Sequence, residues 1–331
     1  MKSPQVTIIV TQRERFSFTQ ESLESIYEHT KSPFKLIYVD GNSPTHIRRY
    51  LESQAGKKGY SLVRNNHYLF PNKARNIGLS KVDTKYAIFI DNDVVVSSGW
   101  LAPLLKCAEE TGATVLSPLI CIGKPLHESL HNGGGSIHIT EEKSGEKLIR
   151  HFSNKDEHGG SKYEGKLSQL RGQIHRGNWD YVEFHCMMVR TEIFKSTGLL
   201  DEGLMSTREH IDFCMTVTQF GGTIYMEPNS IVTYIPGPPE KSDMLFFMLR
   251  WSDKRHYASM KRFKTKWELD EVKYKKPGFR RERAYIAPLV EKIPLIRSKK
   301  KLKKKSTKIL VSLDRLINRF LSFCYDKEQK Q

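Results

Sequence analysis

The chain has 331 residues and a formal net charge of +17, from 54 Lys and Arg against 37 Asp and Glu. With 38% hydrophobic and 27% charged residues, and with every apolar run well short of the ~20 residues that cross a bilayer, its composition excludes a disordered chain and one built of membrane spans. Five widely spaced cysteines without a CxxC pair argue against a disulfide scaffold or a zinc cluster, and a first apolar run of five residues is too short for a signal peptide, so we expect a protein of the reducing cytoplasm.

The first 120 residues alternate between strand-like and helix-like segments. Short apolar runs rich in β-branched residues predict strands at 6–10, 35–40, 61–63, 86–90 and 114–118. Apolar residues at helical spacing predict helices at 18–30, 47–54, 73–80 and 99–111. Strands separated by helices pair in parallel through right-handed crossovers. The predicted fold class is therefore α/β, with a Rossmann-like, mostly parallel central sheet flanked by helices.

The second half of the chain is less regular. Residues 127–177 are polar and rich in Gly, Ser, Lys and His, which predicts a long excursion with weak strands, a mobile loop on the substrate side. Regular patterning then returns, with strands predicted at 181–189 and 223–227 and helices at 191–197 and 206–220. After the breaker Pro-Gly-Pro-Pro at 236–239, the pattern predicts a helical pair over 242–267.

The positive charge is concentrated in the last part of the chain. Residues 276–331 hold 17 Lys and Arg against 5 Asp and Glu, whereas residues 1–275 hold 37 against 32. A basic tail indicates an anionic partner, and the candidates are a membrane surface and nucleic acid. The alternative is a solvated arm that only adds solubility.

The tail also contains an amphipathic pattern. After the lysine-rich run 299–305, helical spacing predicts a helix over 306–324, with Arg315, Asn318 and Arg319 opposite its apolar residues. The apolar residues are Ile309, Leu310, Leu313, Leu316, Ile317, Phe320 and Leu321. Such a helix beside a polybasic segment is typical of an interfacial anchor, which would put the protein on the inner face of the membrane. The alternative is an apolar stripe packed on the body of the protein or on a second copy.

Polar side chains follow three of the predicted strands, at the edge where parallel sheets bind ligands. Thr11 and Arg13 follow the first strand, Asp40 the second, and Asp91 and Asp93 the fourth. Two aspartates at i and i+2 of an extended segment point the same way, so they can share a hard divalent cation that keeps places for phosphate. Such an ion would stabilise a diphosphate leaving group. Asp-x-Asp also occurs in strand-to-loop turns for backbone capping alone.

Four segments in a fixed order resemble glycosyltransferase family 2, whose members have the GT-A fold: VTIIV, YVDGNSPT, NKARNIGLS and YAIFIDNDV, with an acidic cluster further on. The resemblance covers residues 6–234. It implies a nucleotide-sugar donor, with uridine diphosphate as the family's commonest nucleotide, and Mg²⁺ or Mn²⁺ at the Asp-x-Asp motif. The implied reaction is inverting transfer to a hydroxyl of a glycan or lipid-linked acceptor, as in polysaccharide biosynthesis.

Carried over position by position, the resemblance implies two sets of donor-side residues. The nucleotide-sugar contacts are Thr11, Arg13, Asp40, Lys73, Arg75, Asn76, Asp91 and Asn92. The metal ligands are Asp91 and Asp93. The alternative role of Asp40 is a turn cap, and that of Arg75 is a surface salt bridge.

A second polar cluster lies at 206–213. Glu209 and Asp212 share one helix face there, and the resemblance implies that a carboxylate of this cluster deprotonates the acceptor hydroxyl. The sequence departs from the family pattern because His210 occupies the second position of the usual Glu-Asp motif, so the base is Glu209, His210 or Asp212. Ser206 and Glu209 also fit a capping box, which would give Glu209 a purely structural role.

The expected metal site shows a second departure from the family. Many members place a histidine after the late strand, and the matching position here is Tyr234. His185, in the predicted strand at 181–189, is either a donor-side residue or a core histidine bonded to the backbone. Trp100 and Trp251 either stack on sugar faces or pack in the interior.

Three other functions are weighed against this one. Retaining transfer is compatible with the same fold, whereas a nucleotidyltransferase usually has a glycine-rich loop after the first strand and residues 11–15 contain no glycine. A nucleic-acid-binding protein needs basic residues spread over its body, and here they lie in the tail, so no nucleic-acid partner is expected.

The patterns divide the chain into three parts. Residues 1–240 are the expected GT-A catalytic domain, with a donor-binding half at about 1–120 and an acceptor-side half at about 121–240. A helical extension follows at 241–275, and the basic tail occupies 276–331.

Overall fold

The computed structural model describes residues 3–156, 166–272, 286–293 and 300–329. Within these residues, ten strands form one sheet in the order β10-β12-β6-β11-β4-β1-β2-β3, with β5 beside β12 and β7 beside β6. The strands of this sheet are β1 Val6–Thr11, β2 Lys35–Gly41, β3 Ser61–Asn65, β4 Tyr86–Asp91, β5 Val94–Val96, β6 Val115–Ile122, β7 Leu130–Asn132, β10 Gly177–Asn178, β11 Cys186–Arg190 and β12 Ile224–Tyr234.

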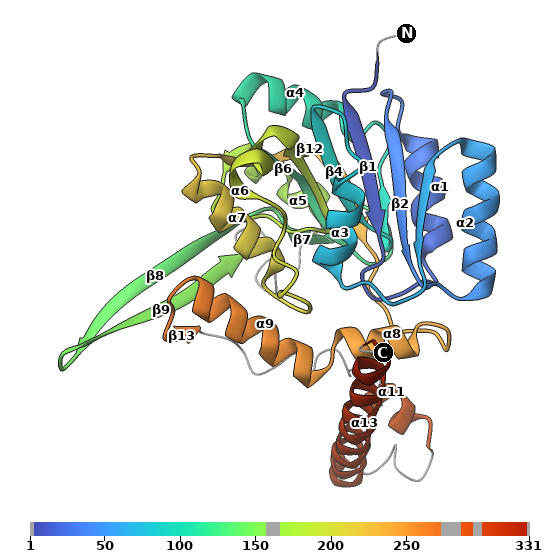
Figure 1. Ribbon diagram of the computed structural model, residues 1–331, viewed down its shortest axis with the longest axis vertical. Helices are drawn as coiled ribbons and strands as arrows, with labels where there is room; N and C mark the ends of the chain where they lie inside the picture. Colours follow the sequence, from blue (N-terminus) through green and yellow to red (C-terminus); the bar gives the residue numbers. More distant parts are fainter. Residues whose placement is uncertain (1–2, 157–165, 273–285, 294–299, 330–331) are drawn as a thin grey trace.

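Helices cover both faces of the sheet (Figure 1). The helices of the described residues are α1 Thr19–His29, α2 Thr45–Lys58, α3 Pro71–Leu79, α4 Leu101–Thr111, α5 Leu167–Leu170, α6 Phe194–Thr197, α7 Glu209–Gln219, α8 Met244–Arg250, α9 Asp253–Lys266, α11 Ile286–Glu291 and α13 Lys300–Glu328. The last four, α8, α9, α11 and α13, lie below the sheet in the view of Figure 1. Because β1 is buried on both faces, its side chains alternate between two cores: Ile8 and Val10 pack with α1, α2 and α4, while Ile9 packs with α3 and α7. The predicted three-layer α/β fold is confirmed.

The sheet has a parallel half and a mixed half. Strands β3, β2, β1 and β4 pair in parallel, as predicted, with Thr11 in register with Asp91. Strand β11 then runs antiparallel between β4 and β6. The predicted strand at 181–189 pairs with β4 only from Cys186 onward, so residues 182–185 form a loop at the end of β4. That loop supplies side chains to the site described below.

The polar excursion at 127–177 is more regular than predicted. Strands β8 (Gly135–Ser144) and β9 (Lys147–Asp156) form a hairpin with ten paired positions that extends away from the sheet, and β13 (Glu271–Val272) pairs with β9 (Figure 1). Much of β8 is exposed on both faces, so burial imposes no alternation of polar and apolar residues. Composition therefore predicted only weak strands here, and not a regular hairpin. Residues 157–165 of the excursion lie outside the described part of the chain.

The predicted helical pair at 242–267 is present as α8 and α9, and the predicted tail helix lies within the longer helix α13. Residues 276–285, 294–299 and 330–331 of the predicted tail lie outside the described residues. None of the helices in the described ranges combines the length and apolar content needed to cross a membrane.

Helix α3 packs unusually close to the sheet because it carries a glycine where it crosses β1 and β2. A Cβ atom added at Gly78 would lie 2.3 Å from Cγ2 of Ile9 and 3.3 Å from Cγ2 of Val39. Both neighbours are core side chains of the central strands. The glycine of the NKARNIGLS segment therefore sets the distance between α3 and the sheet, and with it the position of Arg75.

We expect Gly78→Ala to destabilise the protein, because the added methyl overpacks the α3–sheet interface. The free energy of unfolding should fall by about 1–2 kcal/mol despite the better helix propensity of alanine. The matched control is Gly56→Ala in α2, where an added Cβ meets nothing within 4 Å. That change should leave stability equal or raise it by up to ~1 kcal/mol. Urea unfolding of both variants measures the difference, and equal effects would contradict the packing argument.

Candidate active site

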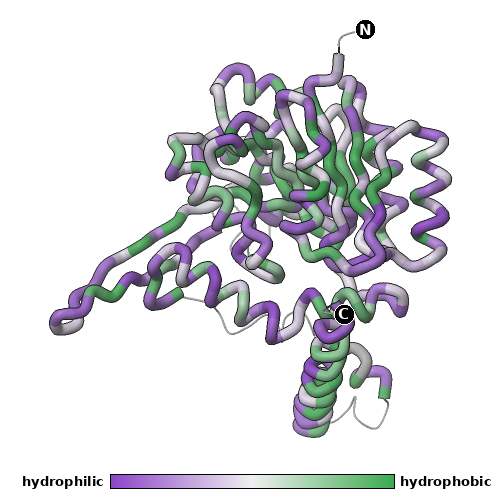
Figure 2. Tube along the Cα trace, in the orientation of Figure 1, coloured by the Kyte–Doolittle hydropathy of each residue, from purple (hydrophilic) through white to green (hydrophobic). Residues whose placement is uncertain are grey.

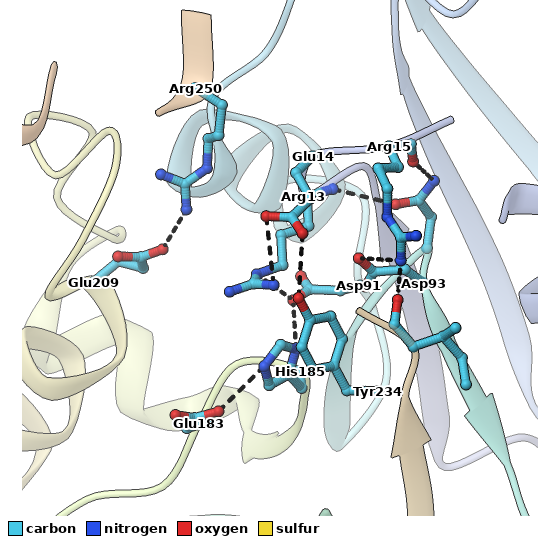
Figure 3. A network of polar contacts seen from close by, with 12 residues as sticks. Arg13, Glu14, Arg15, Asp91, Asp93, Glu183, His185, Glu209, Tyr234 and Arg250 are labelled. Atoms are coloured by element: carbon cyan, nitrogen blue, oxygen red, sulfur yellow. Dashed lines mark hydrogen bonds and ion pairs between the residues drawn. The ribbon is translucent and has the colours of Figure 1, made fainter. Parts of the chain in front are cut away.

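Charged side chains gather at the carboxyl end of β4, where β1 and the 182–185 loop also end (Figure 3). Asp91 is the centre of this cluster. Its Oδ1 accepts a hydrogen bond from Arg75 at 3.0 Å, and its Oδ2 lies 3.3 Å from Nδ1 of His185 and 3.5 Å from Nε of Arg13. Burial alone would raise the pKa of Asp91, but His185 and Arg75 hold it below its ordinary value. Asp91 is therefore an ionised carboxylate among cations.

Arg75 is fully buried in this cluster, so its interpretation as a surface salt bridge is wrong. Its guanidinium lies over the ring of Phe184, 4.1 Å from the centroid, and its Nε–H finds no hydrogen-bond acceptor among the described residues. Nη1 of Arg13 is likewise buried without a hydrogen-bond acceptor there. Buried N–H groups of two arginines thus remain available beside Asp91.

Among the described residues, Asp93 lacks hydrogen-bond donors, whereas N–H groups of the two arginines lack acceptors. It is buried, and neither carboxylate oxygen accepts a hydrogen bond from the described residues, although Nη2 of Arg15 lies 3.7 Å away. Burial raises the pKa of Asp93 above its ordinary value. Oxygens in this state are costly to bury unless something binds them.

The residues at this edge fit a divalent cation. One ligand atom each from Asp91, Asp93 and His185 lies within 4.8 Å of the others. Carboxylate oxygens suit Mg²⁺ and Mn²⁺, and a cation would satisfy the two free oxygens of Asp93. His185 is not bonded through its ring to the backbone as a core histidine would be; its Nε2 lies 3.2 Å from Oε2 of Glu183. Asp91 and Glu183 raise the pKa of His185 to about 9 against the effects of burial and Arg13.

Tyr234, at the position where many family members have a histidine, stacks on the ring of His185 with centroids 4.0 Å apart. At this edge of the sheet the structure has an imidazole from the 182–185 loop, that of His185. His131 extends the cluster, with Nε2 at 3.3 Å from Glu183. Sequence reasoning missed Glu183 and His131. Glu183 could have been found from its place two residues before His185 in the chain. No feature of the sequence pointed to His131.

Trp100 and Trp251 serve packing in this structure. Trp251 donates its indole N–H to Glu14 at 2.8 Å, and the guanidinium of Arg13 lies over its ring. Both contacts hold the loop after β1. Trp100 is buried in the core and donates to Thr30. The sugar-stacking alternative therefore finds no support for either residue.

The other predicted donor-side residues do not join the cluster. Asp40 accepts hydrogen bonds from Gln12 and Ser43 and pairs with Arg64, so it caps the turn after β2. Asn92 holds the loop after β1 by accepting from the backbone N–H of Arg13 and donating to the carbonyl of Arg15.

Three more of these residues have other surroundings. The amide of Asn76 bonds to Leu200 and Glu202. Lys73 is exposed. Thr11 is buried at the end of β1, where its carbonyl accepts from the N–H of Asn92.

The predicted capping box at the second cluster is wrong. Helix α7 begins at Glu209, and the residue before it is Arg208, with a left-handed φ of 72°. Ser206 is therefore not the N-cap. Glu209 instead forms a buried ion pair with Arg250 of α8, with Oε1 and Nη2 2.9 Å apart (Figure 3). Burial alone would raise the pKa of Glu209, but Arg250 and, at longer range, Arg75 hold it below its ordinary value.

The three candidate bases have different surroundings. Asp212 accepts hydrogen bonds from Nε1 of Trp267 at 2.8 Å and Nζ of Lys266 at 2.7 Å, so it fastens α7 to the end of α9. His210 lies against the ring of Tyr181, and burial lowers its pKa. Glu209 is the candidate whose charge interacts with Arg75, the partner of Asp91.

The cluster is closed to solvent in this conformation. Asp91, Asp93 and His185 are each at most 5% exposed. A hollow of about 550 Å³, lined by Thr7, Lys35 and other residues, lies at the opposite, amino end of β1 and β2 and is no part of this site. Arg13, with Nε 3.5 Å from Oδ2 of Asp91, and Tyr234, stacked on His185, lie against the cluster.

Known proteins share this architecture. The family model for Glycosyl transferase family 2 matches residues 7–197. An uncharacterized glycosyltransferase of Rickettsia bellii (strain RML369-C) is 27% identical over 111 residues, which are 33% of this chain and 16% of that protein. The uncharacterized protein y4gI of Sinorhizobium fredii (strain NBRC 101917 / NGR234) is 22% identical over 227 residues, 66% of this chain and 23% of that protein. The chain thus spans less than a quarter of the length of either curated relative.

A solved structure has the same fold. The crystal structure of GalNAc-T7 with UDP, GalNAc and Mn²⁺ aligns with a TM-score of 0.52 and 17% identity, covering 86% of this chain and 57% of that chain. At this identity the likeness concerns the fold alone.

We expect the Glu209–Arg250 pair to behave as a buried charge pair. Arg250→Met leaves a buried carboxylate unpaired and should lower the free energy of unfolding by about 3 kcal/mol, whereas Glu209→Gln/Arg250→Met should recover most of that loss. Lys35→Met, which breaks the exposed pair with Asp83, should cost less than ~1 kcal/mol.

The pH dependence gives a second readout of the same pair. Because the folded-state pKa of Glu209 is lowered, its contribution is present above the ordinary carboxyl pKa and is lost as the pH falls through the folded value. The cost of Arg250→Met in urea unfolding should therefore shrink at acid pH. A cost that stays constant with pH, or a double variant as unstable as Arg250→Met, would contradict this account.

Proposed function

This chain belongs to glycosyltransferase family 2, and we propose that it is a metal-dependent, inverting glycosyltransferase that moves a sugar from a UDP-sugar to a hydroxyl of a glycan or lipid-linked acceptor. The observation that carries the proposal is that, within the described part of the chain, unsatisfied hydrogen-bond acceptors and unsatisfied donors are buried at the same edge of the sheet. Asp93 offers carboxylate oxygens without donors, and Arg13 and Arg75 offer buried N–H groups without acceptors. A diphosphate bound together with a cation would satisfy both.

The proposed donor site uses the charges around Asp91. Asp91 and Asp93 would hold Mg²⁺ or Mn²⁺, and His185 would join them as a ligand after losing its ring proton. The ion would supply positive charge for the diphosphate. Arg75 stays fixed by Asp91 and directs its remaining N–H groups toward phosphate oxygens. Arg13 covers the same carboxylate from the β1 side. These groups stabilise negative charge that develops on the leaving oxygen.

The proposed base is Glu209. It takes the proton of the acceptor hydroxyl while that oxygen forms a bond to the anomeric carbon, and the bond from this carbon to the diphosphate oxygen breaks with its electron pair. One displacement of this kind inverts the anomeric centre. Two observations support the choice: Glu209 is ionised and held by Arg250, and both carboxylate oxygens of Asp212 are already bound by α9.

We expect Asp93→Asn to lose the metal-dependent step without losing the fold. In a thermal-shift assay, UDP and a panel of UDP-sugars are added with and without Mn²⁺. Together with Mn²⁺ these ligands should raise the melting temperature of the wild type and leave that of Asp93→Asn unchanged. Turnover should fall roughly 100-fold or more. Asp83→Asn, at an exposed aspartate, is the matched control. Full turnover of Asp93→Asn, or of the wild type in excess chelator, would remove the metal from the proposal.

The base is tested by three amide or neutral replacements. Glu209→Gln should lower kcat by roughly 10²–10⁴-fold with little change in the KM for the donor, because it removes the proton acceptor. It also leaves the buried Arg250 without its carboxylate partner, so kcat is measured below the melting temperature of the variant. Asp212→Asn should lower the melting temperature and largely retain kcat, since its partners lie in α9. If His210→Gln gives the larger loss in kcat and removes the acidic limb of the pH–rate profile, where the rate rises as the base loses its proton, His210 is the base instead. NMR analysis of the product's anomeric configuration tests inversion.

A further inference from the structure

Helix α13 is attached to the protein by its polar side. Asn318 donates to the carbonyl of Met248 in α8, and Arg315 pairs with Asp253 at 2.7 Å. Asp326 pairs with Arg255 of α9 at 2.6 Å. Asn318 and Ser322 are the residues of α13 that are buried. All these contacts lie in the second half of the helix, so its lysine-rich first half extends away from the sheet domain (Figure 1).

The apolar side of α13 faces away from the body. At about 100° per residue, the positions of Ile309, Leu313, Leu316, Phe320 and Phe323 fall opposite Asn318. These side chains are 50–67% exposed, and Leu310 and Ile317 beside them are 38% and 54% exposed. The hydrophobic stripe is visible along α13 in Figure 2. Among the described residues, the stripe does not pack on the body of the protein, which was one alternative from the sequence.

This arrangement is the reverse of an ordinary surface helix, which buries its apolar stripe and exposes its polar one. A contiguous exposed apolar surface of this kind marks an interaction site in a soluble protein. The polar contacts with Met248, Asp253 and Arg255 hold the stripe outward, so the exposure is fixed by specific bonds.

Charge identifies the partner. Residues 300–329 hold nine Lys and Arg against three Asp and Glu, and five of the lysines precede Ser306. Lys301, Lys305 and Lys308 are exposed, on turns adjoining the stripe. An apolar face flanked by lysines binds a bilayer that carries anionic lipid, because the face enters the acyl boundary while each basic residue gains about 1 kcal/mol near the surface.

We propose that α13 is a membrane-docking helix, held to α8 and α9 by its polar side so that its apolar face enters the surface of an anionic bilayer. A second copy of the chain fits the face less well. Leu310 and Ile317 widen the stripe beyond the narrow seam of a paired coil, and lysine runs brought together in a parallel pair repel each other. The proposal concerns binding only and does not rest on the proposed activity.

The test is sedimentation of the full chain with vesicles of phosphatidylcholine alone and of phosphatidylcholine with 30% phosphatidylglycerol. We expect the wild type to bind the anionic vesicles, with salt-sensitive affinity, and to bind the neutral ones at least tenfold more weakly. Leu316→Ser/Phe320→Ser/Phe323→Ser should lose binding roughly tenfold or more. Its matched control is Leu199→Ser/Phe220→Ser/Tyr257→Ser, at exposed apolar residues outside α13, which should bind as the wild type does.

A charge variant separates the two contributions. Lys301→Gln/Lys304→Gln/Lys305→Gln should lose the preference for anionic lipid, whereas Lys57→Gln/Lys106→Gln/Lys195→Gln should keep it. Circular dichroism and thermal melting verify that each variant is folded. Equal binding by the stripe variant and the wild type, or no binding to anionic vesicles, would overturn the proposal. Sedimentation velocity without lipid tests the other occupant: a dimer that the stripe variant abolishes would assign the face to a second copy.

Discussion

The structure depends on the burial of one ionised carboxylate, Asp91, among cations from separate elements. Arg75 comes from α3, His185 from the loop before β11, and Arg13 from the loop after β1. Burying so many charges is unfavourable unless each is paired, so their geometry must be set by the sheet and its helices. The same crowding leaves oxygens of Asp93 and N–H groups of two arginines without partners among the described residues, and the proposed donor chemistry follows from those unsatisfied atoms.

The parallel half of the fold and the centre of the site were predictable because both depend on local sequence. β-branched runs bounded by turn residues mark β1, β2 and β4, and parallel pairing brings their carboxyl ends together. Asp91 was identified for that reason, whereas Arg75 was identified only through the resemblance of the NKARNIGLS segment to the family. The hairpin β8–β9 was not predictable as a regular element, because strands exposed on both faces carry no alternation.

Partners chosen by tertiary contact were beyond sequence reasoning. Arg250 lies 41 residues after Glu209, and no spacing rule joins them. A capping box was the natural local interpretation of Ser206 and Glu209, yet the left-handed backbone of Arg208 starts α7 later and turns Glu209 toward α8. For Asp40, in contrast, the local interpretation is correct: its position after β2 suggested a turn cap, and it accepts a hydrogen bond from the N–H of Ser43 in that turn. Its part in nucleotide binding stays a prediction.

Helix α8 joins two features that were described apart. At Met248 it accepts the bond that holds α13, and two residues later Arg250 holds Glu209. A docked α13 would therefore fix the height of Glu209 above the lipid headgroups through a single helix of seven residues. An acceptor anchored in the same leaflet would diffuse in two dimensions instead of three, and its reactive hydroxyl would meet the protein at a constant distance from the membrane plane.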